Sequence, residues 1–257
     1  MVEQLPTGID WVTGASSGLG RALALRLARA GRSVAISARR GEALTAVAAE
    51  AATLPGRLIP LPLDVTDAAD CKAAVARLER DVGPLALAVL NAGTHRPVRG
   101  AYLDPEDFRV LAEINLLGTV NCLAPAIAAM RPRGSGQIAI VGSVAGWRGL
   151  PTAAAYGMTK AGLINLAEAL EPDLRAVGIK LQIVNPGFVR TPLTDRNHFP
   201  MPFLMEVDAA ADAFYRGLRS RRFEVVFPWR MGLAMGLLRA LPNRLALAIT
   251  RRIGRRD

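Results

Sequence analysis

The amino-acid sequence predicts an α/β fold: a Rossmann-like, doubly wound parallel sheet flanked by helices, with a helical extension at the C-terminus. Short apolar runs alternate with helical stretches from residue 8 to about residue 185. The runs recur at intervals of roughly 25–30 residues, which is typical of βαβ units. A glycine-rich turn follows the first run. No linker interrupts the alternation, so we expect one domain over residues 1–227, with residues 228–257 as a basic amphipathic extension of it.

The strands are predicted where short apolar runs lie between turn residues. They are Ile9–Thr13, Ser33–Ser37, Leu58–Pro62, Leu85–Leu90, Gln137–Gly142, Ile179–Val184 and Phe223–Phe227. Leu85–Leu90 is apolar throughout, as expected for a strand that is covered on both faces. Asp10 is a polar residue inside the first strand. It is predicted either to cap the entry of that strand or to mark a local irregularity.

The helices are predicted between these strands. They are Leu19–Ala30, Glu42–Thr53, Ala68–Asp81, a long helix from Asp104 to about Met130, and Ala153–Val177. Asp104 is a good N-cap, and Pro105 suits the first helical position. Glu106 and Asp107 complement the positive end of the helix dipole.

Composition excludes several classes of protein. The 257 residues are 51% hydrophobic and 21% charged, which is an ordinary globular composition rather than that of a disordered chain. No secretory signal and no run of about 18 apolar residues is visible, so we expect a cytoplasmic protein without a transmembrane helix. Cys71 and Cys122 lack the neighbours of a zinc site and cannot make a disulfide framework, so each is predicted to be a small buried hydrophobe and no metal is expected.

The glycine turn predicts a site for a dinucleotide. Glycines in the sequence Thr13–Gly20 let the backbone approach a pyrophosphate, whose charge meets the amides and the positive end of the following helix. The predicted binding residues are Gly14, Ser16, Ser17, Gly18, Leu19 and Gly20, with the two serines as extra hydroxyl donors. A plain glycine-rich βα turn is the alternative, which the position after the first strand disfavours.

The residue at the end of the second strand indicates which nicotinamide cofactor binds. An acid there would accept a hydrogen bond from a ribose 2′-hydroxyl, but the sequence has Ala38 followed by Arg39. The planar guanidinium of Arg39 suits a 2′-phosphate, so NADP(H) is favoured over NAD(H). The alternative is that Arg39 and Arg40 only solvate the start of a helix. Asp64 and the sequence Asn91-Ala92-Gly93 follow the third and fourth strands, at the edge where such sheets bind ligands.

Tyr156, Lys160 and Ser143 are the candidate catalytic residues. Tyr156 and Lys160 are four residues apart and therefore share one face of a helix. A nearby ammonium group would favour the phenolate, so we expect Lys160 to lower the pKa of Tyr156 toward 7. Ser143 follows a strand at the ligand edge, where its hydroxyl could hold a substrate oxygen.

Asn115 lies in the middle of a long predicted helix, in the apolar stretch Leu111–Leu117. A buried asparagine needs hydrogen-bond partners. It is predicted either to be satisfied by nearby backbone or to hold a water near Lys160 that extends a proton relay to solvent.

Taken together, these motifs resemble the classical short-chain dehydrogenase/reductase family over roughly residues 8–195. The residues that carry the resemblance are Thr13–Gly20, Asn91-Ala92-Gly93, Asn115, Ser143, Tyr156, Lys160 and Pro186-Gly187. The resemblance implies hydride transfer between nicotinamide C4 and a carbonyl or alcohol carbon.

The resemblance also implies a role for each residue. Tyr156 is the general acid/base, Ser143 holds the substrate oxygen, Lys160 binds the nicotinamide ribose, and Asn115 belongs to the relay. Asp64 is expected to meet the adenine, and Asn91, Ala92 and Gly93 to line the cofactor. Pro186, Gly187, Val189 and Thr191 are expected to cover the nicotinamide and its phosphates. Members usually pair through two long helices, here about 105–130 and 153–177, so a homodimer or homotetramer is expected.

A substrate lid is predicted over about residues 192–215. Its first part is apolar, with Phe199, Met201, Phe203, Leu204 and Met205, and this favours a hydrophobic substrate. His95 and His198 lack partners at metal or triad spacing and are interpreted as incidental.

The C-terminal region carries most of the net charge of +10. Residues 216–257 contain 11 arginines and two acidic residues, whereas residues 1–215 are nearly neutral. Two short helices, Met231–Leu238 and Leu245–Ile249, are predicted on either side of Pro242, with arginines at their ends that include Arg251, Arg252, Arg255 and Arg256. They could anchor the protein at the inner face of an anionic membrane. The alternatives are a lid over the pocket or an oligomer contact. Nucleic acid is disfavoured because no stacking aromatic residues interleave the charges.

The functional prediction is an NADP(H)-dependent oxidoreductase that acts on the carbonyl or secondary alcohol of a hydrophobic, lipid-like substrate. A 3-oxoacyl-thioester reductase remains an alternative within enzymes. A non-catalytic NADP(H)-binding sensor or scaffold is the alternative from another class, and loss of Tyr156 or Lys160 would favour it.

Overall fold

One parallel sheet of seven strands forms the centre of the molecule in the computed structural model, which describes residues 3–196 and 201–253. The strand order is β3-β2-β1-β4-β5-β6-β7. The strands are β1 (Ile9–Thr13), β2 (Ser33–Ser37), β3 (Arg57–Pro60), β4 (Leu85–Leu90), β5 (Gly136–Val141), β6 (Ile179–Pro186) and β7 (Glu224–Phe227). The predicted doubly wound sheet is confirmed, and the strand bounds differ from prediction by at most two residues.

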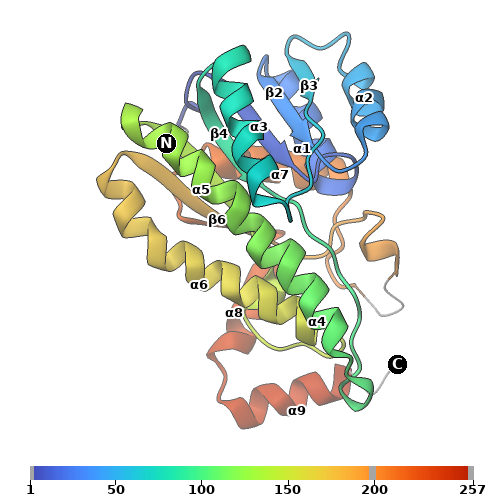
Figure 1. Ribbon diagram of the computed structural model, residues 1–257. Helices are drawn as coiled ribbons and strands as arrows, with labels where there is room; N and C mark the ends of the chain where they lie inside the picture. The colour runs from blue at the N-terminus through green and yellow to red at the C-terminus, as the bar shows by residue number, and fades with distance from the viewer. Residues whose placement is uncertain (1–2, 197–200, 254–257) are drawn as a thin grey trace.

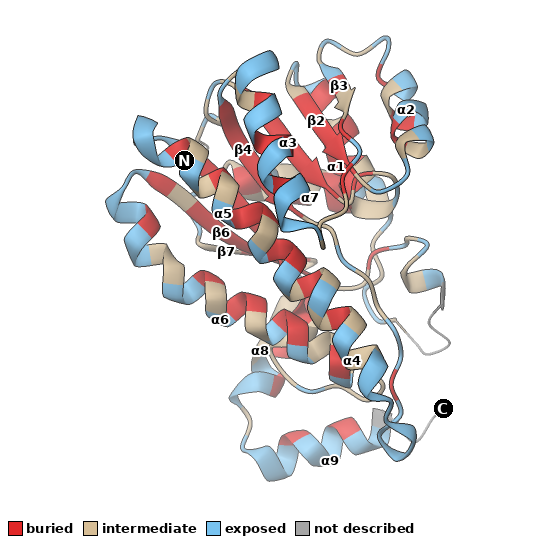
Figure 2. Ribbon diagram, in the orientation of Figure 1, coloured by how far each residue is buried: buried red, intermediate tan, exposed pale blue. Residues whose placement is uncertain are grey.

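Helices cover both faces of the sheet (Figure 1). One face packs against α1 (Gly18–Arg29), α2 (Gly41–Glu50) and α7 (Val207–Leu218), and the other packs against α3 (Ala68–Asp81), α5 (Gly118–Met130) and α6 (Ala154–Ala176). The side chains of β1 alternate accordingly: Ile9 and Trp11 belong to the α3/α5/α6 core, and Val12 belongs to the other. The strands β1, β4 and β5 are buried throughout (Figure 2), whereas the edge strands β3 and β7 are only partly buried.

Asp10 forms a buried ion pair at the start of the sheet. Its side chain is fully buried, and both carboxylate oxygens accept hydrogen bonds from the guanidinium of Arg32, with Arg32 Nε 2.8 Å from Oδ2. Burial raises the pKa of Asp10, and the hydrogen bonds from Arg32 oppose that rise. The pairing of β1 with β4 also shifts register between Ile9 and Asp10. The sequence predicts that Asp10 either caps the strand or marks a local irregularity. The structure shows the second: the strand pairing is irregular at Asp10, and the Arg32 guanidinium pairs with its carboxylate.

The predicted long helix is interrupted. Asp104 does cap it, since its side chain accepts a hydrogen bond from the Glu106 amide at 2.9 Å. The helix then runs as α4 (Pro105–Leu111), a π-helical segment (Ala112–Leu117) and α5. Within the described residues, the continuous stretch Pro105–Arg133 is the one helix long and apolar enough to span a membrane by length and composition. Length and composition alone do not make it a transmembrane helix, so the expected absence of one stays a prediction. The apolar side chains of α5 pack on the sheet and on α3, as in the core helix of a globular protein.

Two helices follow the last strand, as predicted. They are α8 (Trp229–Ala240) and α9 (Asn243–Ile253), and they are separated by Leu241 and Pro242. Met231, Met235 and Leu238 of α8 form a small core with Ala246 of α9 and Val144. This core lies against the segment that follows β5. Arg255 and Arg256 lie outside the described residues.

The two cysteines are free and buried, as predicted, and they lie together. Cys71 on α3 and Cys122 on α5 have their Sγ atoms 3.6 Å apart. They therefore fill the contact between these two helices as small apolar side chains.

Candidate active site

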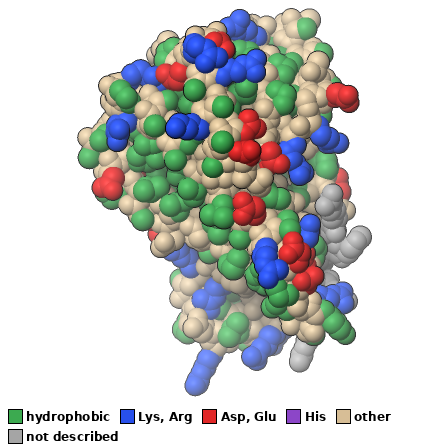
Figure 3. All heavy atoms as spheres, viewed as in Figure 1, with side chains coloured by type: hydrophobic (Ala, Val, Ile, Leu, Met, Phe, Trp, Pro, Cys, Tyr) green, Lys and Arg blue, Asp and Glu red, His purple; other side chains and the backbone are tan. Residues whose placement is uncertain are grey.

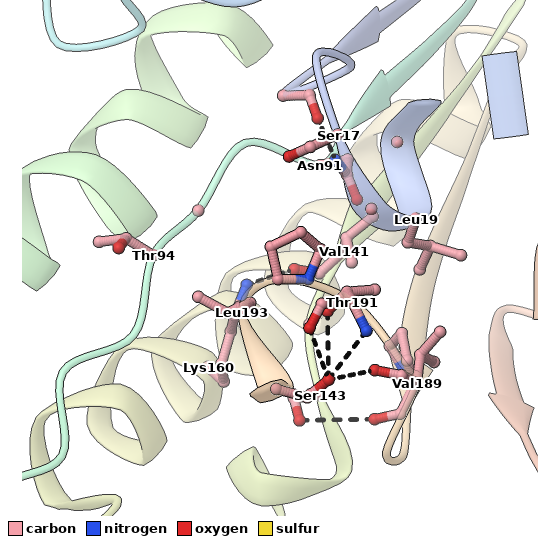
Figure 4. Close-up of a pocket in the computed structure, with 18 of the residues that line it drawn as sticks. Ser17, Leu19, Asn91, Thr94, Val141, Ser143, Lys160, Val189, Thr191 and Leu193 are labelled. Carbon is pink, nitrogen blue, oxygen red and sulfur yellow. Dashed lines mark hydrogen bonds between the residues drawn. The ribbon is translucent and has the colours of Figure 1, made fainter. Parts of the chain in front are cut away.

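The candidate site lies at the carboxyl edge of the sheet, beside the point where the strand order reverses between β1 and β4. Open α/β sheets bind ligands in this crevice. A cavity of about 320 Å³ occupies it. Figure 4 shows Ser17 and Asn91 at one end of this cavity and Ser143 and Lys160 at the other. The predicted residues that line the cavity are Gly14, Ser17, Gly18, Leu19, Gly20, Asn91, Gly93, Ser143, Tyr156, Lys160, Pro186, Gly187, Val189 and Thr191.

The glycine turn presents the N-terminus of α1 to the cavity. Gly14 and Gly18 have φ angles of +66° and +54°, which favour glycine, and a Cβ on Gly14 would lie 2.8 Å from the Ala92 Cα. Ser17 makes no side-chain cap, and the first turn of α1 contains no acidic residue. The first amides of α1 and its positive end are therefore available to an anion. This arrangement fits the pyrophosphate of a dinucleotide cofactor.

Asn91 holds the glycine turn in place. Its Nδ2 donates to the carbonyl oxygens of Thr13 and Gly14 at 3.0 and 3.2 Å. The Thr13 hydroxyl in turn accepts hydrogen bonds from the amides of Asn91 and Ala92, both at 3.0 Å. Asn91 thus lines the cavity and fixes its glycine wall, while Ala92 lies behind it and acts through its backbone.

Tyr156, Lys160 and Ser143 converge on the opposite end of the cavity from two neighbouring elements. Tyr156 and Lys160 lie on α6, and the Lys160 Nζ is 5.6 Å from the Tyr156 ring centroid. Lys160 is buried and donates to the Val141 carbonyl oxygen at 2.8 Å. Ser143 begins the turn after β5, where its Oγ accepts from the Ala145 amide at 3.1 Å and lies 3.4 Å from the Pro186 carbonyl oxygen.

The ionisation of this group differs from the expectation. Burial raises the pKa of Tyr156 above its ordinary value, and a hydrogen bond with Ser143 lowers it only in part. Burial also lowers the pKa of Lys160 to about 8. The expected fall of the Tyr156 pKa toward 7 is therefore not present in this structure, because the ammonium is directed at Val141 and the phenol has lost its water. Tyr156 is protonated at neutral pH.

Asn115 lies in the π-helical segment, beneath the cavity wall rather than on it. Its Oδ1 accepts from the Thr94 amide at 2.8 Å, and its Nδ2 donates to the Thr94 carbonyl and the Thr159 hydroxyl. The side chain is thus satisfied by its neighbours, as one of the two alternatives had it. It fixes Thr94, which lines the cavity. The proton-relay role of Asn115 stays a prediction.

Ser16, Arg39 and Asp64 lie outside the cavity lining. Arg39 is exposed just after β2 and forms no hydrogen bond or ion pair with the described residues. Asp64 accepts hydrogen bonds from the amide and the hydroxyl of Thr66, and Asp67 is the residue that caps α3. Asp64 is therefore not a helix cap.

The predicted lid divides into two parts. Pro192, Leu193 and Thr194 line the cavity, and Met205 pairs with Val189 in a short bridge. From Val207 onward the chain is instead the helix α7, which packs on α1 and buries Phe214 fully. Residues from Val207 to 215 thus belong to a core layer. His198 and Phe199 lie outside the described residues.

Two neighbours of the site were missed from the sequence. Thr94 follows Asn91-Ala92-Gly93 directly, so its position one residue beyond the motif could have indicated it. His95 had been interpreted as incidental, but its ring meets the Tyr156 ring edge-on with the centroids 4.9 Å apart. Burial lowers the pKa of His95, which therefore lies neutral beside the phenol.

Comparison with known proteins identifies relatives over nearly the whole chain. Residues 10–199 match the short chain dehydrogenase family. An uncharacterized oxidoreductase of Myxococcus xanthus is 39% identical over 242 residues, which cover 94% of this chain and 96% of the relative. A 3-oxoacyl-[acyl-carrier-protein] reductase of Thermotoga maritima is 32% identical over 185 residues, covering 72% of this chain and 75% of that protein.

Solved structures share the fold. A short-chain dehydrogenase from Sphingobium yanoikuyae in complex with NADPH has a TM-score of 0.78 and 29% identity, covering 91% of this chain and 96% of the other. A short chain dehydrogenase/reductase from Burkholderia phymatum in complex with NAD has a TM-score of 0.82 and 21% identity, covering 92% of this chain and 94% of the other. Since the family match spans most of the chain and its glycine turn, serine, tyrosine and lysine meet in one cavity, this protein belongs to the short-chain dehydrogenase/reductase family and is a nicotinamide-dependent oxidoreductase.

Proposed function

We propose that this protein reduces the carbonyl group of a hydrophobic substrate with NADPH. The observation that carries the proposal is that Tyr156, Ser143 and Lys160 line the same cavity as the uncapped N-terminus of α1. The residues that would hold the cofactor are the glycine turn, Lys160 and the segment after β6. A bound reduced nicotinamide would supply the hydride to the carbonyl carbon.

The chain's own residues would then supply the proton and hold the oxygen. Tyr156 donates its phenolic proton to the carbonyl oxygen, for which the raised pKa keeps it protonated at neutral pH. Ser143 donates a hydrogen bond to the same oxygen as negative charge develops on it. Lys160 holds its position through the Val141 carbonyl and has further N–H groups for a ribose. Together with the hydride that a bound reduced nicotinamide would supply, the proton from Tyr156 would convert the carbonyl to an alcohol.

The preference for NADP(H) rests on Arg39. This arginine lies at the end of β2, where a ribose 2′-substituent is bound in such folds, and Ala38 before it offers no carboxylate. Since Arg39 has no partner among the described residues, its guanidinium is available to a 2′-phosphate. The NADPH in the related Sphingobium structure is compatible with this proposal, whereas the more distant Burkholderia protein holds NAD.

The hydrophobic character of the substrate is inferred from the walls at the catalytic end. Pro192 and Leu193 line the cavity. Met201 to Met205 continue this apolar segment, which we propose as the substrate lid. Phe203 in it is 44% exposed, so an apolar ligand could cover it.

A 3-oxoacyl thioester is the second candidate substrate. The observation that favours it is the relative from Thermotoga maritima, which is named a 3-oxoacyl-[acyl-carrier-protein] reductase. The arginines of α8 and α9 belong to helices that pack on the segment after Ser143, where they could meet an acidic carrier. Comparing a carrier-bound 3-oxoacyl thioester with the same acyl chain as a simple ketone would separate the two candidates.

We also infer a paired assembly through α5 and α6, in a reducing compartment such as the cytoplasm. These two helices lie side by side in Figure 1, and Leu117 just before α5, Val120 in α5 and Met158 in α6 are exposed. Apolar side chains on neighbouring helices suit a contact with a second copy. The free thiols of Cys71 and Cys122 fit a reducing compartment.

The experiment that tests the proposal is a titration of the purified protein with NADPH and NADH, followed by an NADPH-oxidation screen. The screen would cover hydrophobic ketones, aldehydes and 3-oxoacyl thioesters. NADPH binding with oxidation that depends on Tyr156 is expected. Folded protein that binds neither cofactor would contradict the proposal and favour a non-catalytic role.

A further inference from the structure

The outer face of α8 is an apolar stripe that nothing covers among the described residues. Trp229, Leu233 and Leu237 are spaced by four residues and therefore lie on one side of the helix. They are 69%, 58% and 62% exposed. The opposite side of α8 already packs in the small core through Met231, Met235 and Leu238. The helix is thus apolar on two sides, and packing within the chain accounts for only one.

Arginines without an ion-pair partner in the described part of the chain lie in the same two helices, and the guanidinium of Arg230 is 5.6 Å from the Trp229 ring centroid. These arginines are Arg230, Arg239, Arg244, Arg251 and Arg252, and no Asp or Glu occurs between residues 225 and 256. All five are exposed, and none forms an ion pair within residues 3–196 and 201–253. The lower end of the molecule in Figure 3, where α8 and α9 lie in Figure 1, shows blue and green side chains together.

The helix α9 adds further exposed apolar and positively charged side chains. Of its side chains from Asn243 to Arg252, only Ala246 and Thr250 are buried. Leu245 and Ile249 are one turn apart and are 55% and 43% exposed, beside the packed face. The two helices together therefore expose leucine, isoleucine and tryptophan side chains as well as five arginines.

The combination of positive charge and exposed apolar side chains on α8 and α9 favours one kind of binding partner over the others. A second copy of the chain would bring two sets of unpaired arginines together, which is electrostatically unfavourable. An acidic protein would match the arginines but not the apolar stripe between them. An anionic lipid surface offers negative headgroups and an apolar interior at adjacent depths. We propose that α8 and α9 dock the protein on an anionic membrane surface, with Trp229, Leu233 and Leu237 at the boundary between headgroups and acyl chains.

The packed face of α8, on the side of the helix opposite the exposed stripe, lies against a wall of the cavity. A Cβ on Gly187, which lines the cavity, would lie 2.8 Å from the Met231 Cγ of α8. Val144, next to Ser143, belongs to the same small core as α8 and α9. Docking would therefore bring the cavity close to lipid. A carbonyl substrate dissolved in the membrane could then enter the cavity from the lipid. The entry of substrate rests on the proposed function, whereas the docking does not.

The first test is sedimentation of the full-length protein with lipid vesicles. Vesicles of phosphatidylcholine with about one-third phosphatidylglycerol are expected to bind it, and vesicles of phosphatidylcholine alone are expected to bind it at least about tenfold more weakly. Binding should fall as salt is raised from about 0.1 M to about 1 M, because salt screens the arginines. Folded protein that stays in the supernatant with anionic vesicles at low salt would overturn the proposal.

Paired variants separate the two contributions. Leu233→Gln/Leu237→Gln should weaken binding at least about tenfold by removing apolar contact. Arg230→Gln/Arg239→Gln should weaken it by at least about tenfold, at about fivefold for each charge lost. The control Arg77→Gln/Arg80→Gln makes the same change of charge on exposed residues of α3 and should bind like the parent protein. Equal losses in the control and in the α8 variants would mean that net charge alone drives binding, and would overturn the assignment to α8.

Tryptophan fluorescence gives a direct readout of the docked face. Trp11 is fully buried, and the Trp147 indole already donates to Glu224 at 3.0 Å, so Trp229 is the indole that would change its surroundings. Anionic vesicles should shift the emission to shorter wavelength, and Trp229→Phe should abolish the shift. If Leu233→Gln/Leu237→Gln instead dissociates an oligomer in gel filtration, the stripe is a contact between copies and the proposal fails. Vesicle binding without NADPH oxidation would leave the docking intact and count against the proposed function alone.

Discussion

The ammonium group of Lys160 donates a hydrogen bond to the carbonyl oxygen of Val141 at 2.8 Å, and this bond joins α6 to the end of β5. It fixes the helix that carries Tyr156 relative to the turn that carries Ser143. The same bond keeps a buried cation in the structure, since Lys160 is only 4% exposed. The position of Tyr156 relative to Ser143 therefore depends on the Lys160 ammonium, a charged group that is poorly solvated in the folded protein.

Stability should therefore rise with pH in a way that depends on Lys160. The folded protein releases the Lys160 proton near pH 8, whereas an unfolded lysine releases it near pH 10.5. Between these values the unfolded state binds more protons, so the free energy of unfolding increases with pH, by about 2 kcal/mol from pH 7.5 to 9.5. Urea denaturation of the parent protein and of Lys160→Met at several pH values measures this effect. The Met variant lacks the titrating group, and a stability difference between the two that stays constant across this range would contradict the prediction.

Tyr156→Phe should leave the fold and cofactor binding nearly unchanged and lower turnover by about a hundredfold or more. The variant keeps the aromatic ring that packs against His95 and loses only the hydroxyl that gives the proton. Measuring kcat with a substrate from the screen, and NADPH affinity by fluorescence, separates the two effects. Tyr102→Phe, on a side chain that is 81% exposed, is the matched control. Near-normal turnover of Tyr156→Phe would remove Tyr156 from its proposed role.

Features of the fold that depend on neighbouring residues could be predicted from the sequence. The strands follow from short apolar runs, and the parallel sheet follows from their spacing. The N-cap at Asp104 and the break at Pro242 are likewise local signals, and both are present in the structure. The glycine turn before α1 was predictable because its glycines and its position after β1 are contiguous in the chain. The glycine turn, which forms one wall of the cavity, could therefore be located from the sequence.

Features that depend on distant residues could not be predicted. Arg32 neutralises Asp10 from 22 residues away, and nothing in the strand pattern identifies it. The partners of Asn115 are Thr94 and Thr159, which the fold brings together from two other elements. The π-helical segment changes the hydrogen-bond register without changing the apolar pattern. The direction of the Tyr156 pKa depended on burial and on where the Lys160 ammonium points, which only the three-dimensional structure reveals.

Loss of one partner of the buried Asp10–Arg32 pair should destabilise the fold more than loss of both. Arg32→Met would leave the fully buried Asp10 carboxylate without its cation and should lower the free energy of unfolding by about 3–5 kcal/mol. Asp10→Leu/Arg32→Met removes both charges and should recover most of that loss. Arg80→Met, which breaks a solvent-exposed pair with Asp81, should have a much smaller effect. Thermal and chemical denaturation of the three variants provide the measurement. A double variant less stable than Arg32→Met would show that the pair contributes more than mutual neutralisation.

Arg39→Ala should weaken NADPH binding by about 10- to 100-fold and leave NADH binding nearly unchanged. The reason is that a guanidinium on a phosphate forms charge-assisted hydrogen bonds worth about 1.5–3 kcal/mol, and only NADPH carries the 2′-phosphate. Arg40→Ala is the matched control, because Arg40 is also exposed, loses the same charge and precedes α2 directly. Calorimetric titration of NADPH and NADH into the parent protein, Arg39→Ala and Arg40→Ala is the measurement. It gives, for each variant and each cofactor, the ratio of its dissociation constant to that of the parent protein. Equal losses for NADPH and NADH, or an Arg40→Ala variant as impaired as Arg39→Ala, would show that Arg39 acts through general charge and does not recognise the 2′-phosphate.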